Sequence, residues 1–421
     1  MEKKYEGIKL ILILLGSIIL GYVLMIGVYT IPTEKIYSNV MTATDFFNED
    51  TPYPQVINGY MDSQLDNWTD SLMLLIAATK TNETIAYQAM NNAHIVLEDQ
   101  DCFETLENIN ENNSLKQVYS SGYGRYWHGY LVILKPLLYI FTYKQLIYIN
   151  MMMQQLILVS VCCIYILKKQ GKMIVPFLGV YFFFNPISLA LSIQFSGIWY
   201  ITMISLFVLA IKEWSGRKKI IIFILIGILT SYIDLLTYPL VTLGIPVLYA
   251  VLNKTDVEKF VKKLFVLIRY SIAWGIGYAG MWSGKWIIGT LITKKNLIEN
   301  AYQQAAYRSG YVASDIKFSY IDILKGILRA SNKLVICFVL AVGGLIFLYE
   351  LIKKQKIYIK DNIVILLAIL GYPFLWYGVF ANHSFWHTFF TYRTFGIALY
   401  VVLYALVGNW ANLQKHKYLS K

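Results

Sequence analysis

Three aspartates spaced four residues apart, Asp62, Asp66 and Asp70, form the first group of residues able to do chemistry. In a helix this spacing would place the carboxylates on one face, where each like-charged pair destabilises the helix by about 0.2–0.5 kcal/mol. A metal ion, an arginine or a protonated group of a substrate would offset that repulsion. A second interpretation stays open, in which Asp66 or Thr69 caps a helix that begins near Asp70.

Two histidines and two arginines form a second group, which suits an anion. His383 and His387 have the i, i+4 spacing of a zinc-binding pair, but the glutamate of the zinc-protease motif is missing between them. Hydrogen bonding to a phosphate or a sugar is another interpretation, and packing at the membrane interface is a third. Arg393 and Arg308 could each hold a phosphate through a bidentate pair of N–H groups.

His128 and Asp234 are further candidates for binding a substrate. His128 follows Arg125 and lies among aromatic residues of the kind that line a membrane interface. Asp234 lies near the outer end of an apolar segment, where an ionisable side chain is a functional candidate by default. The alternative for Asp234 is a hydrogen bond to a neighbouring helix end or to a tyrosine.

The composition indicates the class of fold that must position these side chains. The 421 residues are 57% hydrophobic and 15% charged, whereas soluble domains have about 45–50% apolar and about 25% charged residues. This excludes an ordinary soluble enzyme and a disordered chain, and four cysteines cannot supply a disulfide framework. The sequence predicts an all-α polytopic membrane protein.

About ten apolar segments approach the roughly 20 residues that a membrane-spanning helix needs. They fall at residues 8–30, 145–167, 173–192, 198–212, 219–236, 239–253, 264–292, 333–352, 362–381 and 394–413. The chain is therefore expected to consist of transmembrane units at 1–30, 145–292 and 333–421. Two longer inserts, at 31–144 and 293–332, separate these units.

Lysine and arginine residues indicate the orientation of the chain. Every second short loop is basic, and the six basic segments hold 21 of the 37 Lys and Arg residues. Because basic loops stay in the cytoplasm, we expect both termini to be cytoplasmic and the protein to cross the cell membrane many times. The same alternation accounts for the positive net charge without a nucleic-acid partner. The basic segments are 1–9, 168–172, 212–219, 254–263, 353–360 and 414–421.

The two inserts then lie on the non-cytoplasmic side, and the first holds 14 of the 25 acidic residues. We expect both to be ordered caps, with short helices at 71–79 and 86–98 in the first. The helix at 71–79 is predicted to lie along the membrane surface. Residues 129–143 are apolar over too short a stretch to span a bilayer comfortably, and with Lys135 in the middle they predict an interfacial or re-entrant helix.

This arrangement resembles the GT-C class of integral-membrane glycosyltransferases. The shared features are a first span, a long exterior loop with acidic residues near its start, a surface helix and many further spans. In that class an Asp or Glu of the first exterior loop is the catalytic base, the donor is a polyprenyl-phosphate sugar, and the acceptor enters from outside. The resemblance implies that Asp66 or Asp70 corresponds most closely to the acidic residue of the family, with Asp45 and Glu49-Asp50 as competitors.

The resemblance implies a membrane glycosyltransferase that transfers a sugar to a glycan or lipid-linked acceptor of the cell envelope. A carboxylate would accept the proton of the acceptor hydroxyl. Arg308, Arg393 and either His383 or His387 would neutralise the departing phosphate, and Asp234 would orient the acceptor or a catalytic side chain. Clustered aspartates fit Mg²⁺ or Mn²⁺ and equally fit a metal-free base, so both alternatives stay open.

A flippase or transporter of lipid-linked saccharide is the alternative function. It is favoured by Asp234 within an apolar segment and by the break at Lys135-Pro136, because discontinuous helices build transport sites. Three features argue against it. The exterior loop at 31–129 is long, the polar clusters lie on one side of the membrane, and the sequence contains no internal repeat of the kind common in such carriers.

Overall fold

The structure is a computed structural model that describes residues 2–47, 51–109, 117–119, 122–252, 260–313, 316–353 and 362–419. The protein is mostly helical, at 78%, as the sequence predicts. The strands described form two short antiparallel pairs, β1 (Ile95–Leu97) with β2 (Gln117–Tyr119) and β3 (Val312–Ala313) with β4 (Ile316–Lys317).

Five helical stretches of the described chain are long and apolar enough to cross a membrane, and a bent helix pair gives a sixth if it is counted as one span. The five lie in α1 (Glu2–Tyr29), α8 (Tyr143–Leu167), α11 (Ile193–Ile211), α14 (Phe260–Thr293) and Thr388–Gly408, which includes the start of α22 (Gly396–Leu419). The bent pair is α16 (Tyr320–Ala330) with α17 (Lys333–Lys353), and the bend measures 93°. Several helices can therefore cross a membrane, but ten spans are not confirmed.

The other predicted spans are shorter, broken or more charged than a complete crossing requires. Asn185 adopts a left-handed backbone conformation and Pro186 starts a new helix, which divides the segment predicted at 173–192. The segment at 362–381 is divided after Gly371, where Pro373 lies in the first turn of a new helix, although Gly371 itself keeps a right-handed helical conformation. The helices concerned are α9 (Ile174–Phe183), α10 (Pro186–Leu191), α12 (Gly216–Ile233), α13 (Val241–Leu252), α18 (Ile363–Leu370) and α19 (Tyr372–Val379).

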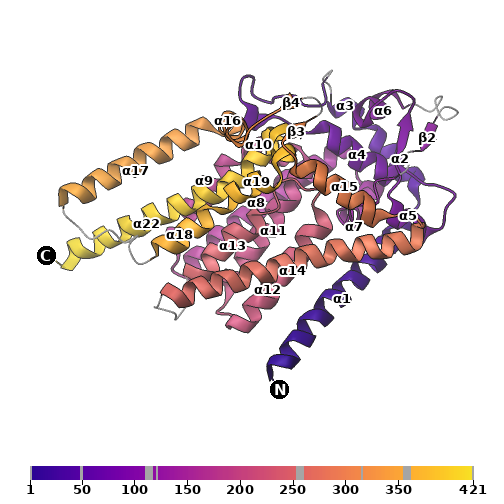
Figure 1. The fold of residues 1–421 in the computed structure, drawn as a ribbon. Helices are drawn as coiled ribbons and strands as arrows, with labels where there is room; N and C mark the ends of the chain where they lie inside the picture. The colour runs from indigo at the N-terminus through magenta and orange to yellow at the C-terminus, as the bar shows by residue number, and fades with distance from the viewer. Residues whose placement is uncertain are drawn as a thin grey trace.

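The first and second inserts gather at one end of the long helices and form a cap there (Figure 1). Both chain ends lie away from this cap. The helices of the cap are α2 (Thr33–Met41), α3 (Thr44–Phe47), α4 (Asn67–Ala78), α5 (Ile85–Asn91), α6 (Cys102–Asn108) and α15 (Leu297–Ser309). The cap therefore brings residues of both inserts to the same end of the bundle.

Two predictions about the cap helices are wrong in part. Helix α4 matches the prediction at 71–79, but every residue of it except Trp68 is buried, so it is not a surface helix. Its apolar residues surround the helix axis instead of forming one face, which is the pattern of a buried helix. Helix α5 ends at Asn91 in a left-handed cap, and the predicted helix at 86–98 gives way there to strand β1.

Helices α7 (Leu131–Ile140) and α14 connect the cap to the bundle. Helix α7 has ten residues, too few to span a bilayer, and it buries Lys135 completely. Helix α14 has 34 residues and is therefore about 50 Å long, longer than the roughly 30 Å of a hydrocarbon core. Its extra turns reach the cap, where Lys285 donates hydrogen bonds to Met90 and Asn92.

Close helix packing in the bundle depends on glycines. A Cβ on Gly227 of α12 would lie 2.1 Å from the backbone oxygen of Trp274 on α14. The reciprocal contact joins Gly277 of α14 and the backbone oxygen of Ile224, also at 2.1 Å. Small residues at a helix interface are typical of membrane helices, because they let the two backbones approach closely.

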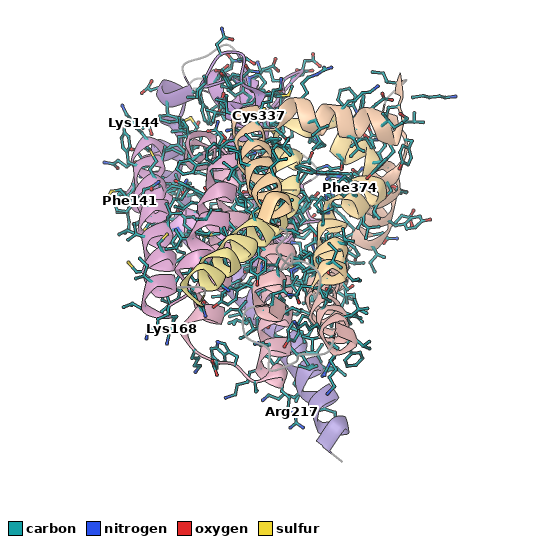
Figure 2. The ribbon with its side chains drawn as sticks, turned by 90° about the vertical axis from the view of Figure 1, so that its left-hand side faces the viewer. Phe141, Lys144, Lys168, Arg217, Cys337 and Phe374 are labelled. Atoms are coloured by element: carbon teal, nitrogen blue, oxygen red, sulfur yellow. The ribbon has the colours of Figure 1, made fainter. Side chains whose placement is uncertain are left out.

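Two of the basic turns lie at the end of the bundle opposite the cap. Lys168 and Arg217 lie toward the end where α1 begins, and Lys144 lies toward the opposite end (Figure 2). Residues 254–259 and 354–360 of two other basic segments lie outside the described residues.

Candidate functional site

The segment that carries the three aspartates is folded as a turn, a cap and a first helical turn, so the carboxylates do not share one helical face. Asp62 lies in the short 3-10 helix η1 (Met61–Ser63), and Asp66 caps α4. The carboxylate of Asp66 accepts hydrogen bonds of 3.0 Å from the backbone nitrogen and from the hydroxyl of Thr69. The capping interpretation of Asp66 is therefore confirmed, although the helix begins at Asn67 and not near Asp70.

Asp70 holds the start of a second helix. Its Oδ1 accepts a hydrogen bond from the backbone nitrogen of Gln194 at 3.0 Å. Its Oδ2 accepts from the backbone nitrogen of Ile193 at 2.9 Å and from the Tyr143 hydroxyl at 3.0 Å. Asp70 thereby neutralises the exposed N–H groups at the beginning of α11. Both of its oxygens are engaged by the protein.

Asp62 is fixed by residues that follow the break between α9 and α10. Its Oδ2 accepts a hydrogen bond from Nδ2 of Asn185 at 2.9 Å. Its backbone oxygen accepts from the hydroxyl of Ser188 at 2.9 Å, and this hydroxyl accepts in turn from Nη2 of Arg393 at 2.8 Å. These hydrogen bonds connect the segment of residues 62–70, which we call the aspartate segment, to Arg393 in the last span.

Arg393 is fully buried, and each of its guanidinium nitrogens donates a hydrogen bond within the protein. Its Nε donates to the backbone oxygen of Phe184 at 3.1 Å, and Nη1 donates to that of Phe389 at 3.4 Å. The Phe195 ring covers the guanidinium at 4.1 Å. This geometry favours a residue that positions the aspartate segment over one that grips a phosphate.

Burial raises the pKa values of Asp66 and Asp70. Burial raises the pKa of Asp66 to about 7, while the hydrogen bonds from Thr69 and the charge of Arg393 oppose the rise and the charge of Asp70 adds to it. Burial also raises the pKa of Asp70 to about 6, against the hydrogen bonds from α11 and Tyr143. A carboxylate with a pKa near neutrality can both accept and release a proton at physiological pH. Asp66 has a pKa near neutrality, and its carboxylate accepts fewer hydrogen bonds than that of Asp70.

The second predicted group comes together between α15 and α20 (Ala381–Trp386). Nη1 of Arg308 donates to Nδ1 of His383 at 3.3 Å. Because Nδ1 is the acceptor, Nε2 carries the proton, and it donates to the backbone oxygen of Leu236 at 2.7 Å. The His387 ring lies 4.8 Å from that of His383 and stacks on Phe390.

Both histidines are neutral at physiological pH. Burial lowers the pKa of His387 to about 4, with the charge of Arg308 adding to the effect. Burial likewise places the pKa of His383 well below its ordinary value. They can therefore donate or accept hydrogen bonds, and Arg308 carries the positive charge of this group. Within the described residues no three His, Cys, Asp or Glu side chains are grouped as metal ligands.

Tyr126 joins the histidine group to a second arginine. The guanidinium of Arg308 lies 5.9 Å from the centre of the Tyr126 ring, and that of Arg125 lies 5.5 Å from it. Nε of Arg125, the Tyr278 hydroxyl and Nε1 of Trp282 are buried without a hydrogen-bond partner among the described residues. Unsatisfied buried donors beside two guanidinium groups indicate a place where an anion or a sugar could bind.

His128 and Asp234 have their hydrogen-bonding groups engaged within the protein. Nε2 of His128 donates to the backbone oxygen of Tyr123 and Nδ1 accepts from the Tyr130 hydroxyl, both at 2.9 Å. The carboxylate of Asp234 accepts hydrogen bonds from the backbone nitrogen and the hydroxyl of Thr237. Asp234 thereby shapes the turn whose Leu236 oxygen receives His383.

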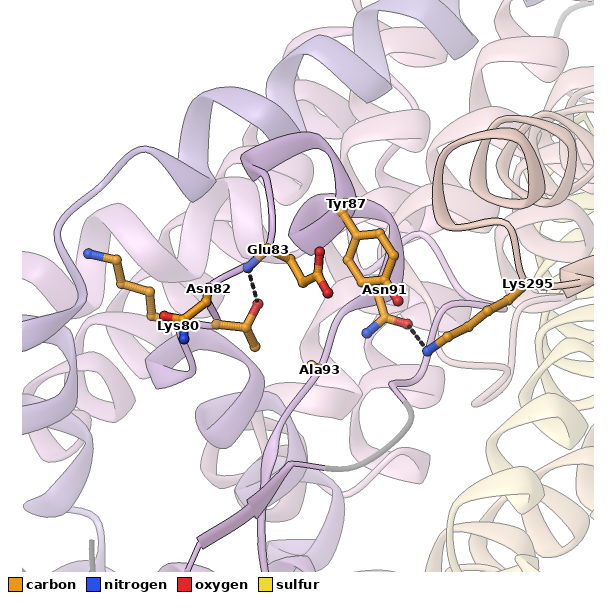
Figure 3. Close-up of a pocket in the computed structure, with 8 residues that line it drawn as sticks. Lys80, Asn82, Glu83, Tyr87, Asn91, Ala93 and Lys295 are labelled. Carbon is orange, nitrogen blue, oxygen red and sulfur yellow. Dashed lines mark hydrogen bonds between the residues drawn. The ribbon is translucent and has the colours of Figure 1, made fainter. Parts of the chain in front are cut away.

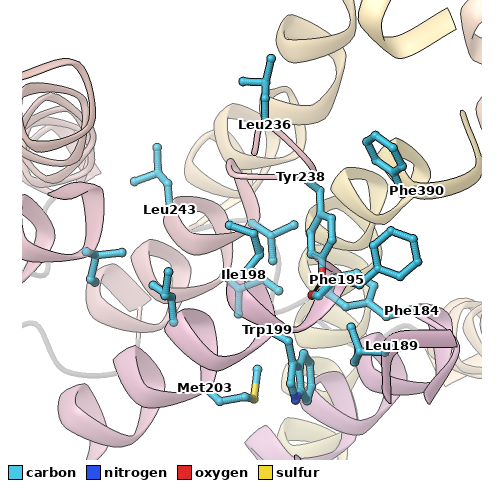
Figure 4. Packing of buried hydrophobic residues seen from close by; sticks show 14 of the residues in the cluster. Phe184, Leu189, Phe195, Ile198, Trp199, Met203, Leu236, Tyr238, Leu243 and Phe390 are labelled. Carbon is cyan, nitrogen blue, oxygen red and sulfur yellow. Dashed lines mark hydrogen bonds between the residues drawn. The ribbon is translucent and has the colours of Figure 1, made fainter. Parts of the chain in front are cut away.

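The predicted residues thus form two clusters. The aspartate cluster consists of Asp62, Asp66, Asp70 and Arg393, and the arginine–histidine cluster consists of Arg308, His383 and His387 with Tyr126 and Arg125. Aromatic rings lie between the clusters: Phe195 lies 6.0 Å from Phe390, which stacks on His387, and Tyr238 donates a hydrogen bond to the Phe195 backbone (Figure 4). Two successive rings, those of Phe195 and Phe390, therefore separate Arg393 of the first cluster from His387 of the second.

A stretch of the first insert lies against the segment that carries the aspartates. Residues 51–57 run along 63–67, with the nitrogen of Leu65 donating to the oxygen of Pro54 at 2.9 Å and that of Asn67 donating to Pro52 at 3.0 Å. Asp66 is 2% exposed, and its backbone nitrogen donates to the Ser192 hydroxyl at 3.1 Å. Glu49 and Asp50, two competing candidates for the base, lie outside the described residues, and Asp45 is exposed.

The pockets do not coincide with these clusters. A pocket of about 320 Å³ lies beside α5, and its lining includes Lys80, Glu83, Tyr87, Asn91 and Lys295, of which Lys295 donates to Asn91 at 3.1 Å (Figure 3). None of the predicted site residues lines it or a second, smaller pocket at the end of α1. The chemistry lies in the hydrogen bonds and charges of the clusters, since a hollow alone supplies none.

Two partners of the site were missed from the sequence. Asn185 and Ser188 form hydrogen bonds with Asp62 and Arg393. The sequence signal for them was the Asn185-Pro186 pair inside an apolar segment, which marks a helix break.

Comparisons with protein-family models, with curated proteins and with solved structures find no match for this chain. The functional assignment therefore depends on the chemistry of its own residues.

Proposed function

We propose that the protein is a membrane glycosyltransferase of the GT-C type, which moves a sugar from a polyprenyl-phosphate donor to a glycan or lipid-linked acceptor. The reaction takes place at the capped end of the bundle, on the non-cytoplasmic side of the cell membrane. The observation that carries the proposal is Asp66, a buried carboxylate with a pKa of about 7 that feels the charge of Arg393. Arg393 is connected in turn to the arginine–histidine cluster through the rings of Phe195 and Phe390. Lys168 and Arg217 at the opposite end support this orientation, with both termini in the cytoplasm.

Asp66 acts as the catalytic base in this proposal. Its carboxylate accepts the proton of an acceptor hydroxyl while that oxygen forms a bond to the anomeric carbon of the donor sugar. The bond between the anomeric carbon and the phosphate oxygen breaks, and its electron pair leaves with polyprenyl phosphate. Asp70 and Asp62 are positioning residues, because their oxygens are engaged by α11 and by Asn185.

Arg308 stabilises the charge that develops on the departing phosphate. A guanidinium has five N–H donors, so its hydrogen bond to His383 leaves donors for phosphate oxygens. Arg125, whose guanidinium lies over the Tyr126 ring, adds a second positive charge. The neutral His387 ring offers a hydrogen bond to the phosphate. Phosphate binding by Arg393 is not part of the mechanism, because its nitrogens are committed to Phe184, Phe389 and Ser188.

Access to Asp66 requires movement of the stretch that lies against the aspartate segment. Residues 51–57 are attached to the aspartate segment by a few backbone hydrogen bonds, which an acceptor can replace. Closure of such a stretch over the bound substrates excludes water, and water would otherwise hydrolyse the donor.

The test uses purified protein in liposomes that contain a radiolabelled polyprenyl-phosphate sugar. The proposal predicts loss of label from the donor and its appearance in an acceptor added outside. Movement of intact donor between the leaflets without consumption would contradict the proposal and identify a lipid carrier instead.

A further inference from the structure

A second pocket of the cap lies at the end of the first span. It has a volume of about 240 Å³ and is enclosed by the end of α1, the start of α2, α5 and α7. Its lining includes Tyr29, Glu34, Lys80, Gln88 and Lys135. None of these residues takes part in the transfer proposed above.

Lys135 makes this pocket chemically unusual. Its side chain is completely buried, and its ammonium group donates a hydrogen bond of 3.0 Å to the backbone oxygen of Ala77. The Tyr29 ring lies 4.5 Å from the same nitrogen. An ammonium group has three donors, and no carboxylate of the described chain forms an ion pair with Lys135. A buried charge without a counter-charge is costly, so an anion in the pocket would stabilise it.

The remaining charges of the pocket leave room for an anion. Lys80 and Glu34 both line it, and both side chains are exposed at its rim. Their opposite charges offset each other, which leaves Lys135 as the net positive charge of the lining. Burial lowers the pKa of Lys135 to about 8, so most of the amine is protonated at pH 7.

The surface beside the pocket is apolar. On α7, which carries Lys135, Ile133 and Ile140 are exposed by 60% and 61%. On α1, Leu20 and Val23 are exposed by 58% and 54%. Apolar side chains exposed on a membrane helix contact acyl chains, so these surfaces would face the tails of a lipid whose head lies at the end of α1.

We propose that this pocket binds the phosphate group of an anionic membrane lipid, with Lys135 donating to a phosphate oxygen and the acyl chains lying on α1 and α7. A free phosphate has the same headgroup chemistry but would make no use of the adjacent apolar surfaces. The lipid is a component separate from the donor and the acceptor of the transfer reaction.

The experiment measures the change in thermal unfolding temperature of the purified full-length protein in detergent. Phosphatidylglycerol, phosphatidylcholine and inorganic phosphate are added separately, to the wild type and to Lys135→Met, Lys80→Met and Lys144→Met. Lys144 is an exposed lysine at the start of α8 and serves as the matched control. Far-UV circular dichroism and gel filtration establish that each variant is folded.

Phosphatidylglycerol is expected to raise the unfolding temperature of the wild type and of Lys144→Met, with phosphatidylcholine and inorganic phosphate giving much smaller shifts. Lys135→Met should bind phosphatidylglycerol at least about tenfold more weakly, and Lys80→Met about threefold more weakly. If Lys135→Met does not fold, Lys80→Met decides. Equal shifts in the wild type and in the pocket variants would overturn the proposal. A rise in unfolding temperature with phosphatidylcholine equal to that with phosphatidylglycerol would also overturn it. An equal rise with inorganic phosphate would overturn the lipid assignment and show a free-phosphate site. Binding is measured without donor or acceptor, so failure of the transferase proposal would leave these results unaffected.

Discussion

Arg308 donates a hydrogen bond of 3.3 Å to Nδ1 of His383, although 75 residues separate the two in the sequence. This contact joins the second insert to the junction before the last span. It also fixes the tautomer of His383, whose Nε2–H then points to the backbone oxygen of Leu236. The arginine is thereby held in place while donors remain for an anion.

Removal of the Arg308 charge should reduce sugar transfer. Arg308→Gln is expected to lower the rate about 10²-fold, because one preorganised charge on a developing anion contributes on that scale. Arg329→Gln is the matched control, since Arg329 is an exposed arginine on α16 of the same insert. The rates of donor consumption are compared. Equal rates in the two variants would remove Arg308 from the mechanism.

The pH dependence of transfer should report the protonation of Asp66. Burial raises the pKa of Asp66 to about 7, and a base must be deprotonated to act. The rate is therefore expected to rise about tenfold per pH unit below about pH 6.5 and to level off above about pH 8. His387 adds no such limb, because burial lowers its pKa to about 4. A rate that falls as the pH is raised from 6 to about 8 would be inconsistent with this assignment.

Loss of Arg393 should affect stability first. Arg393→Ala removes hydrogen bonds to Phe184, Phe389 and Ser188, and hydrogen bonds from a buried charged donor contribute about 1.5–3 kcal/mol each. We expect the free energy of unfolding to fall by about 3 kcal/mol, measured by thermal or chemical unfolding in detergent. Unchanged stability together with lost transfer would instead restore Arg393 as a phosphate ligand.

Asp70 should be separable from Asp66 by substitution. Asp70→Asn weakens the acceptance of N–H groups at the start of α11, so we expect a loss of about 1 kcal/mol in unfolding free energy. Transfer should stay within about threefold of the wild type when the folded fraction is taken into account. A much larger loss of transfer at full folding would show that Asp70 takes part in the proton transfer.

The sequence predicted the class of fold well because composition reports it directly. Helix ends were predicted well where an apolar segment has clear limits, as at the end of α1 and at both ends of α8. The segment at 173–192 has the length and apolar character of a span, but Asn185 takes up a left-handed conformation that depends on its contacts with Asp62 and Ser188. Hydropathy averages over such a break and does not detect it.

The proximity of some candidate residues was predicted from the sequence, but their hydrogen bonds to distant parts of the chain were not. The pairing of His383 and His387 follows from helical spacing, and the structure places their rings 4.8 Å apart. The hydrogen bonds of Asp70 to Ile193 and Gln194 cross more than 120 residues and depend on tertiary packing. No local pattern distinguishes a carboxylate that caps a distant helix from one that acts as a base.

The most direct test of the central claim compares sugar transfer by Asp66→Asn and Asp45→Asn in liposomes. Asp45 is an exposed aspartate of the same insert and was a competing candidate for the base. With both variants folded and in the membrane, the account predicts a loss of about 10²–10⁴-fold for Asp66→Asn and an unchanged rate for Asp45→Asn. Wild-type transfer by Asp66→Asn would contradict the account.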